Sequence, residues 1–545
     1  MKYNNYPPST RPTAMGLNGM AASAHPFATL AGINILKKGG NAFDAIVGIA
    51  STLNVVEPFM SGMGGVGVAL VYNSKKNKLQ ALNFSGSAPK LADPEKYTSE
   101  AKNIGPWAPL VPGNVAGWLE IQENLGVLDR EEVFKDAIHY AKNGFPMTHF
   151  HYTMFGNSVP RLNKFPSGEI ILNNGKVSPP GTKIVMPELA KSLELVAKNG
   201  ADEFYRGSIA KKIIESMNKY GGLISEDDLN SVKAEWSDPL TVKYKNFEVS
   251  TVPPNSSGFQ ILETLKILET LPNEQIKFQD PDFVHRFIET VKLAATDRIA
   301  YGGDQALGIT PTDKLLSNEY AKYQSSRIST DKTNLLAGEV FNPDAPQGAL
   351  TPVDLDAYDG GMTTHFSVSD RDGNVVSITQ TLGGGFGSAL APEGTGIFLN
   401  NMGDWFDLHN GSRNQIGPNR KQDMCLSPTQ TFKNGEFFAS VGTPGSWGIL
   451  QTTSQMLINL LDFEMNMQQV IDSPRFKAIG GNRVEMEARF PSSLLDNLQQ
   501  RGHDIVNLPD WSPSVGGGHG IKFDKETGSY QGGADPRRDG YAFGF

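Results

Sequence analysis

The sequence predicts an α+β protein of ordinary globular composition, and three observations support this class. Hydrophobic residues make up 39% of the 545 residues and charged residues 20%, as in chains that bury a large core. Segments with helical periodicity dominate residues 129–300. Further along, the turn signals Asp372-Gly373 and Asn434-Gly435 each lie between two runs of strand-forming residues, which indicates hairpins.

The first part of the chain alternates between helix and strand signals. Apolar residues between positions 30 and 36 have helical spacing, and Gly39-Gly40 ends that helix. Asn41 can cap a second helix that runs to Val56. Strands are expected at residues 67–72 and 79–84, and further helices at residues 187–199, 257–271 and 283–301.

Residues 338–362 differ in composition from the segments on either side. They are rich in proline and glycine and show little periodicity, which is typical of an exposed linker. A strand pattern begins directly behind this linker, at Thr363. The expected strands are residues 365–369, 375–382, 429–433 and 436–441, and the expected helices are residues 449–461 and 491–501.

Charge and cysteine content exclude several classes of protein. The net charge is 49 − 58 = −9 without basic clusters, which argues against binding to nucleic acid or to an anionic membrane. Cys425 is the single cysteine, so the chain can form no internal disulfide. The N-terminal residues lack the apolar stretch of a secretory signal, and no run of about 18 apolar residues is present. We expect a cytoplasmic protein without a metal or organic cofactor, in which His149 and His151 are exposed.

Thr363 is the candidate nucleophile. A threonine hydroxyl is a weak nucleophile until a base removes its proton. Cleavage of the bond Met362–Thr363 would free the α-amino group of Thr363, whose ordinary pKa of about 8 lets it act as that base. By itself, a threonine at the start of a strand usually reflects β-propensity alone. The surrounding motifs favour the catalytic interpretation.

Motifs along nearly the whole chain resemble those of the γ-glutamyltranspeptidase family. Residues 363–368, Thr-Thr-His-Phe-Ser-Val, followed by Asp372-Gly373-Asn374, resemble the family's processing site. The other motifs occur in the family's order at residues 39–45, 56–58, 61–65, 111–117, 253–258, 400–401, 427–429, 442–445 and 535–538.

The resemblance implies a fold, a processing step and catalytic residues. The implied fold is a four-layer αββα sandwich with two stacked antiparallel sheets and an added helical region. The implied processing is self-cleavage into residues 1–362 and 363–545, which stay associated. By resemblance, Thr363 is the nucleophile and the Thr381 hydroxyl contacts it and assists processing. Gly445 and Ser446 stand where the family places two backbone N–H donors for the oxyanion, with Ser446 in place of the usual glycine.

The sequence departs from the family at the positions that bind a γ-glutamyl group. No arginine occurs near Ser85, where the family has one for the substrate carboxylate. The family's pocket side chains align with Gly383, Met402, Trp405, Met424 and Cys425. Trp405 is equally compatible with a core position and with a lid over the acyl pocket. Asp404 remains nearby and can still meet an amine.

We therefore expect a self-processing threonine amide hydrolase or γ-glutamyl-type acyl transferase that resembles glutathione hydrolase. One alternative is an amidase for a non-γ-glutamyl substrate, similar to cephalosporin acylase. Another is a relative that binds a metabolite without turnover. The expected partner in each case is a small molecule, an amide or γ-glutamyl-type substrate for the enzymes, with neither nucleic acid nor membrane involved.

Overall fold

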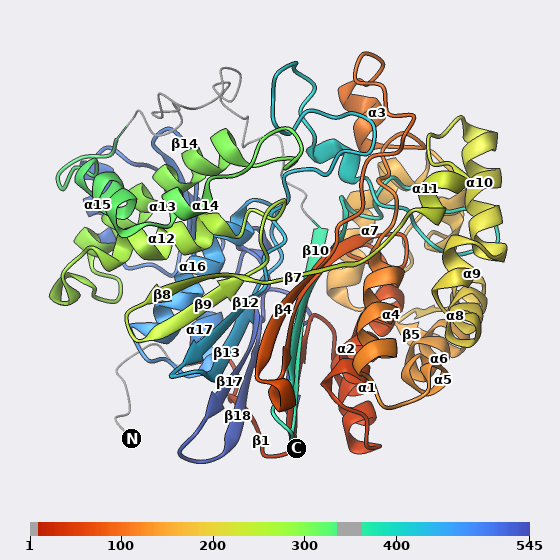
Figure 1. The fold of residues 1–545 in the computed structure, drawn as a ribbon, viewed down its shortest axis with the longest axis horizontal. Coiled ribbons are helices and arrows are strands. Elements are labelled where there is room, and N and C mark those ends of the chain that lie inside the picture. Colours follow the sequence, from red (N-terminus) through yellow and green to blue (C-terminus); the bar gives the residue numbers. More distant parts are fainter. Residues whose placement is uncertain (1–8, 335–361) are drawn as a thin grey trace.

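Two seven-stranded sheets lie face to face in the centre of the molecule, and helices cover both outer faces (Figure 1). The computed structural model describes residues 9–334 and 362–545, so the expected linker at residues 338–361 lies outside the described residues. All strand pairs in both large sheets are antiparallel. In spatial order, the first sheet is β1 (Ala14–Gly16), β18 (Ser529–Ala534), β17 (His519–Asp524), β13 (Glu436–Gly442), β12 (Thr429–Lys433), β9 (Phe247–Thr251) and β8 (Leu240–Tyr244). The second is β19 (Tyr541–Gly544), β2 (Gly19–Ser23), β10 (Met362–Asp370), β11 (Val375–Gly383), β3 (Val66–Asn73), β4 (Lys78–Phe84) and β7 (Glu235–Ser237).

Each large sheet combines strands from both sides of the bond Met362–Thr363. In the second sheet, β10 pairs with β2 and β11 pairs with β3. In the first sheet, β12 pairs with β9 and β1 pairs with β18. Backbone hydrogen bonds therefore hold residues 9–334 and 363–545 together independently of the peptide bond between positions 362 and 363.

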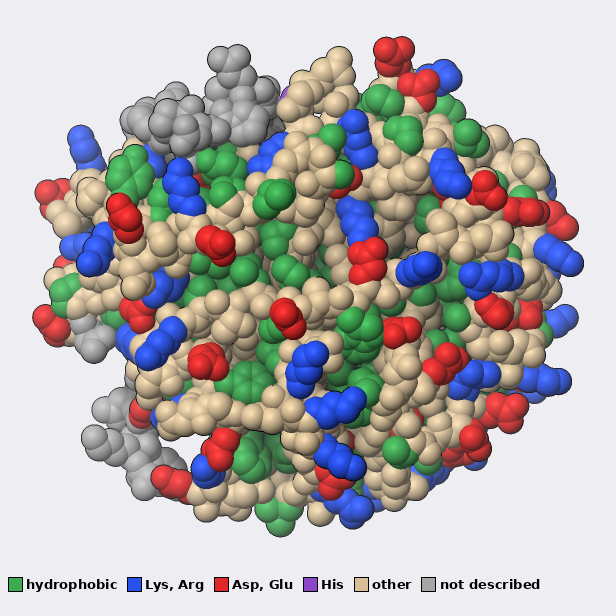
Figure 2. Space-filling view, viewed as in Figure 1, with side chains coloured by type: hydrophobic (Ala, Val, Ile, Leu, Met, Phe, Trp, Pro, Cys, Tyr) green, Lys and Arg blue, Asp and Glu red, His purple; other side chains and the backbone are tan. Residues whose placement is uncertain are grey.

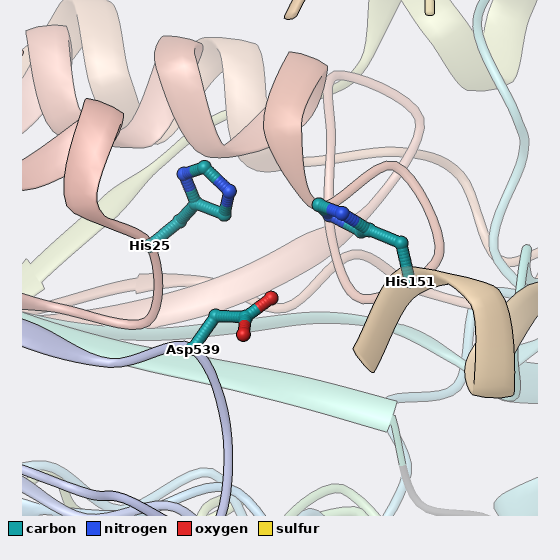
Figure 3. Close-up of side chains that lie close together, drawn as sticks. All are labelled: His25, His151 and Asp539. Atoms are coloured by element: carbon teal, nitrogen blue, oxygen red, sulfur yellow. The ribbon is translucent and has the colours of Figure 1, made fainter. Parts of the chain in front are cut away.

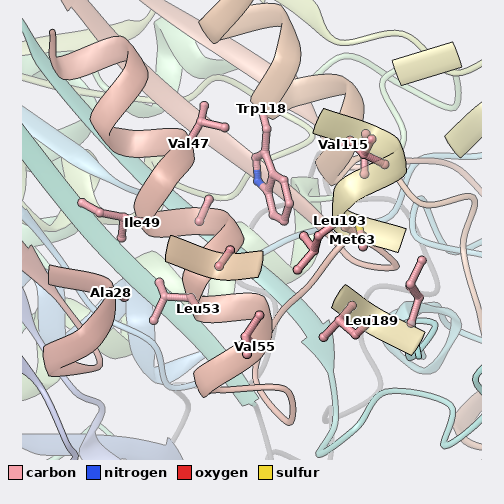
Figure 4. Close-up of a cluster of buried hydrophobic side chains, with 14 of the residues drawn as sticks. Ala28, Val47, Ile49, Leu53, Val55, Met63, Val115, Trp118, Leu189 and Leu193 are labelled. Carbon is pink, nitrogen blue, oxygen red and sulfur yellow. The ribbon is translucent and has the colours of Figure 1, made fainter. Parts of the chain in front are cut away.

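The helical layer over the second sheet is built on α1 (Pro26–Lys37), α2 (Ala42–Val56) and α4 (Asn114–Leu125). Asn41 caps α2 as predicted, and its side chain accepts hydrogen bonds from the backbone N–H groups of Phe43 and Asp44. Every residue of α2 is buried because the helix lies between β10 and β11 on one side and other helices on the other. Figure 4 shows part of the resulting apolar core, which includes Leu53 and Trp118.

The helical layer over the first sheet contains α12 (Phe259–Glu269), α13 (Pro281–Tyr301), α16 (Gly448–Leu461) and α17 (Met467–Asp472). Its helices α16 and α17 pack on β13 and β17, so the expected four layers are confirmed. An additional helical region, residues 130–230, follows α4 and lies on the side of the second sheet (Figure 1). The remaining helices are α3 (Ser99–Asn103), α5 (Arg130–Val133), α6 (Lys135–Asn143), α7 (His149–Leu162), α8 (Pro187–Asn199), α9 (Ala201–Tyr205), α10 (Ser208–Tyr220), α11 (Glu226–Asn230), α14 (Thr312–Leu315), α15 (Asn318–Ser326) and α18 (Ser492–Gln500). The short sheets are β5 (Phe145–Pro146) with β6 (Lys183–Ile184), and β14 (Phe476–Gly480) with β15 (Arg483–Glu487) and β16 (Asp504–Leu508).

The layer between the two large sheets contains buried polar side chains as well as apolar ones. Ser367 of β10 and Ser440 of β13 are 3.1 Å apart through their hydroxyl oxygens. Gln430 of β12 donates from Nε2 to the carbonyl oxygen of Leu70 on β3 at 3.1 Å. Such polar contacts between the sheets favour the alignment of the two sheets that pairs them.

The surface has no single dominant charge on the face shown in Figure 2, where acidic and basic side chains are interspersed. Among the described helices, none combines the length and the apolar composition that crossing a membrane requires.

Candidate active site

Thr363 and Thr381 lie directly opposite each other, at the start of β10 and near the end of β11. The Thr363 hydroxyl donates to Thr381 Oγ1 at 3.2 Å. The Thr381 hydroxyl donates to the carbonyl oxygen of Met362 at 2.5 Å and accepts the backbone N–H of Gly383 at 2.8 Å. A hydroxyl has one proton, so these three bonds fix the direction of the relay from Thr363 through Thr381 to Met362.

This relay converges on the peptide bond that the sequence predicts to be cut. The carbonyl carbon of Met362 is the acyl carbon of that bond, and Thr363 carries the attacking hydroxyl. A donor on the carbonyl oxygen stabilises the negative charge that develops there during attack. Both threonines are buried, with 1% of each residue exposed, so the surroundings screen this interaction weakly.

Two glycines allow this close arrangement. A Cβ at Gly65 would lie 2.4 Å from the carbonyl oxygen of Thr381, so a larger residue would push β11 away. Gly383 has φ +94°, and a Cβ there would lie 2.3 Å from Asn401 Oδ1. The missing side chain at position 383 is therefore a packing requirement of this chain.

Gly445 and Ser446 form a tight turn between β13 and α16. Gly445 has φ +134° and Ser446 has φ +56°, a backbone region that favours glycine. Their N–H groups precede the N-terminus of α16, whose dipole favours negative charge. Both residues line the same cavity as Met362. The turn is thus close to the bond that the relay polarises.

A cavity of about 440 Å³ adjoins this bond. Its charged lining residues are Arg538 and Lys477, and Lys477 pairs with Glu485 at 3.0 Å. Much of the remaining wall is apolar. The lining comprises Met60, Phe150, Thr153, Met154, Asn157, Met362, Gly445, Ser446, Trp447, Gly448, Gln451, Lys477, Ala478, Ile479, Pro513, Ser514 and Arg538.

Arg538 and Glu57 contact the chain at Thr363 and Thr364. Arg538 donates from Nη1 to the carbonyl oxygen of Thr363 at 3.3 Å. Glu57 is buried and accepts the Thr364 hydroxyl at 3.2 Å. Burial raises the pKa of Glu57 to about 8 despite the opposing attraction of Arg538, so its carboxyl is mostly protonated at neutral pH.

None of the residues expected to contact substrate belongs to the lining of this cavity, although Gly383 lies opposite Met362 in the β10–β11 pair. Met402, Trp405, Met424 and Cys425 are at most 6% exposed and belong to an apolar core cluster with members from both large sheets. Trp405 packs on Trp447, which lines the cavity, with ring centroids 5.0 Å apart. Burial raises the pKa of the Cys425 thiol well above its usual value.

The two remaining expected residues are held by neighbouring amides. Asp404 accepts Asn103 Nδ2 at 2.7 Å, and Ser85 Oγ accepts Asn255 Nδ2 at 3.4 Å. Ser85 is buried and Asp404 is partly buried. Neither side chain lines the cavity beside Met362.

His25, His151 and Asp539 come together, as Figure 3 shows. The expectation that His151 is exposed was wrong, because it lies on the buried side of α7 and not on a strand. His151 Nε2 contacts the carbonyl oxygen of Val56 at 2.6 Å, and its Nδ1 accepts the backbone N–H of Thr148. His25 Nδ1 likewise caps α1. The Nδ1 lone pairs of His25 and His151 each accept a backbone N–H group. This cluster is therefore better suited to joining helices than to binding a metal.

Sequence reasoning did not identify Arg538, Glu57 or the apolar cavity wall. Arg538 and Glu57 lie within motifs that resemble the family's, but the motifs alone do not show what these side chains face. Met60, Phe150 and Met154 carry no sequence signal, because an apolar residue in a pocket wall looks the same as one in a core.

Comparisons with known proteins identify the family. The family model described as gamma-glutamyltranspeptidase matches residues 28–545. The glutathione hydrolase-like YwrD proenzyme of Bacillus subtilis (strain 168) is 34% identical over 544 residues, which cover 98% of this chain and 99% of that protein. The acylase ACY 1 proenzyme of Pseudomonas sp. (strain SE83) is 32% identical and covers 97% and 93%.

Solved structures give the same result for the fold. The crystal structure of cephalosporin acylase from Bacillus halodurans has a TM-score of 0.88 at 30% identity, and the match covers 100% of this chain and 99% of that one. The crystal structure of Helicobacter pylori gamma-glutamyltranspeptidase has a TM-score of 0.56 at 28% identity over 60% of this chain. In sequence over residues 28–545 and in fold, this chain belongs to the γ-glutamyltranspeptidase family.

Proposed function

We propose that this chain cuts itself before Thr363 and then hydrolyses amides through an ester on the Thr363 hydroxyl. The observation that carries the proposal is the relay from Thr363 through Thr381 to the carbonyl oxygen of Met362. It places a nucleophile and an oxyanion donor on one peptide bond. The relatives named above as proenzymes support a processing step.

Self-cleavage begins with attack of Thr363 Oγ1 on the carbonyl carbon of Met362. The peptide nitrogen of Thr363 leaves with a proton, and the Met362 acyl group is transferred to the hydroxyl oxygen as an ester. Water then hydrolyses the ester, which leaves Thr363 with a free α-amino group. Residues 1–362 and 363–545 remain associated, because both segments contribute strands to each of the two large sheets.

Amide turnover repeats the same chemistry on an external substrate. The free amine of Thr363 takes the proton of the Thr363 hydroxyl, which attacks the substrate carbonyl. The backbone N–H groups of Gly445 and Ser446 stabilise the oxyanion. The amine product leaves with a proton, and water or an acceptor amine releases the acyl group from the ester.

Substrate specificity differs from that of a γ-glutamyl enzyme in this proposal. Met402, Trp405, Met424 and Cys425 are packed in a core and supply no charged group for an amino acid end. We therefore favour an acylase-type amide substrate over glutathione itself. The similar acylase ACY 1 proenzyme and cephalosporin acylase support this choice.

The test follows the covalent state of the chain. Wild-type protein should give two bands on a denaturing gel, and mass spectrometry should place the cut between Met362 and Thr363. Thr363→Ala should stay intact and inactive. Thr364→Ala removes the neighbouring hydroxyl, which contacts Glu57, and should still be cut. Active wild-type protein that remains a single chain would refute the proposal, and a cut chain that turns over no amide would favour the binding protein alternative.

A further inference from the structure

Arg537 and Arg538 are neighbours in sequence but lie in opposite electrostatic surroundings. Arg537 is buried and pairs with Glu487 at 2.7 Å and with Asp535 at 3.1 Å. Arg475 joins the same network through Asp535 at 2.8 Å. The carboxylates of Glu487 and Asp535 are therefore paired with other arginines and form no ion pair with Arg538.

Arg538 points the other way, into the wall of the cavity beside Met362. Its Nη1 donates to the carbonyl oxygen of Thr363 at 3.3 Å and to Met60 Sδ at 3.6 Å. Within residues 9–334 and 362–545, no carboxylate lies at ion-pairing distance from its guanidinium, and its Nε and Nη2 donate to no residue. A guanidinium has five N–H donors; Nη1 is already engaged and Nε is buried, so the two donors of Nη2 remain for a ligand.

The carboxylates that act on Arg538 from further away do not neutralise it. Asp535 is already paired with two other arginines. Glu57 is mostly protonated at neutral pH, because burial raises its pKa to about 8. A partly buried cation without a paired carboxylate is costly, and an anionic ligand would remove that cost.

The cavity is also where an acyl group must lie. In self-cleavage the Met362 acyl group is transferred to Thr363 Oγ1, and in turnover the substrate acyl group is transferred to the same oxygen. Met362 lines the cavity together with Arg538. Once water has removed the Met362 acyl group from Thr363 Oγ1, the acyl part of a substrate takes the position next to the same oxygen. Its body would then contact Met60, Phe150 and Met154, and its far end would meet Arg538.

We propose that Arg538 is the carboxylate-binding residue of the acyl pocket, and that the substrates are amides of a dicarboxylic acid with an apolar chain. This assignment rests on the proposed Thr363 chemistry. The family's carboxylate-binding arginine lies near Ser85 and is absent from this chain. Arg538 would supply the positive charge from a different position. The lining contains no acidic side chain to pair with an ammonium group, so an α-amino group on the acyl chain gives no advantage.

The experiment compares substrates that differ only in one negative charge. Succinyl, glutaryl and adipyl p-nitroanilides are each paired with their methyl esters on the cleaved wild-type protein. A charge-assisted contact of ordinary strength predicts that the best free acid exceeds its ester by about 10- to 100-fold in kcat/KM. Arg538→Met should remove most of this ratio, and Arg538→Lys should keep part of it. Lys477→Met, which removes the other cation of the same cavity, should leave the ratio above about 10.

A second measurement needs no variant and covers the case in which Arg538→Met fails to fold or to cut itself. Free glutarate should inhibit wild-type hydrolysis of a methyl ester substrate at least about 10-fold better than glutaramide does. Equal inhibition, or an acid-to-ester ratio near one in the wild type, would overturn the Arg538 assignment while leaving Thr363 chemistry in place. Loss of all Thr363-dependent turnover would instead refute the proposed function.

Discussion

The hydroxyl of Thr381 is the most informative single group to remove. Thr381→Val keeps the shape and the β-branched character of the residue but deletes one donor and two acceptor contacts. The donor contact, to the carbonyl oxygen of Met362, strengthens as negative charge develops there. Loss of such a donor costs roughly 3 kcal/mol in the transition state. Since each 1.36 kcal/mol is a factor of ten, self-cleavage should slow by about 100-fold.

The assay is a time course of freshly refolded precursor on a denaturing gel. Thr381→Ser retains the hydroxyl and should cleave within about tenfold of the wild-type rate. Thr379→Val is the matched control, because Thr379 is buried on the same strand and face and contacts His365 Nδ1 at 2.8 Å. It removes a buried hydrogen bond without touching Met362, so it should lower stability and leave the cleavage rate near that of the wild type. Cleavage of Thr381→Val at the wild-type rate would refute the relay.

Two further predictions concern buried charge. Glu57→Gln removes a carboxyl whose pKa rises from 4.5 to about 8 on folding, so the wild type loses stability as pH rises through this interval. In urea unfolding, the free energy of unfolding of Glu57→Gln should equal that of the wild type below pH 4.5. The difference should grow to at most about 5 kcal/mol near pH 8 and then level off. A difference that does not change with pH contradicts this reasoning. Arg537→Met breaks the buried pairs with Glu487 and Asp535 and should cost about 3–5 kcal/mol in the same assay. Lys525→Met, at an exposed pair, should change little, and equal effects of the two substitutions would argue against burial as the cause.

Local pattern was sufficient to predict many individual elements. The helix α8 spans Pro187–Asn199 and the strand β12 spans Thr429–Lys433, as expected. Asn41 caps α2, and the turns at Gly373 and Gly435 both join antiparallel strands. These features depend on residues within a few positions of each other, so capping, periodicity and turn chemistry specify them.

The active-site region was only partly predictable. Thr363 and Thr381 are 18 residues apart on one hairpin, and the register set by the turn at Asp372-Gly373 places them opposite each other. Arg538 reaches the same site from the C-terminal segment, 175 residues after Thr363. No local pattern relates two positions at that separation, and the side chain could have joined the Arg537 network instead.

The sequence by itself determined the class of fold, the family and the candidate nucleophile, because each depends on short motifs whose order is visible along the chain. Only the tertiary structure decided which side chains face Thr363. The packing of helices on two sheets buried Met402, Trp405, Met424 and Cys425 and left Arg538 at the cavity wall. Burial and electrostatic surroundings are properties of three-dimensional neighbours, and the same arginine has a different role when its nearest carboxylates are already paired with other arginines.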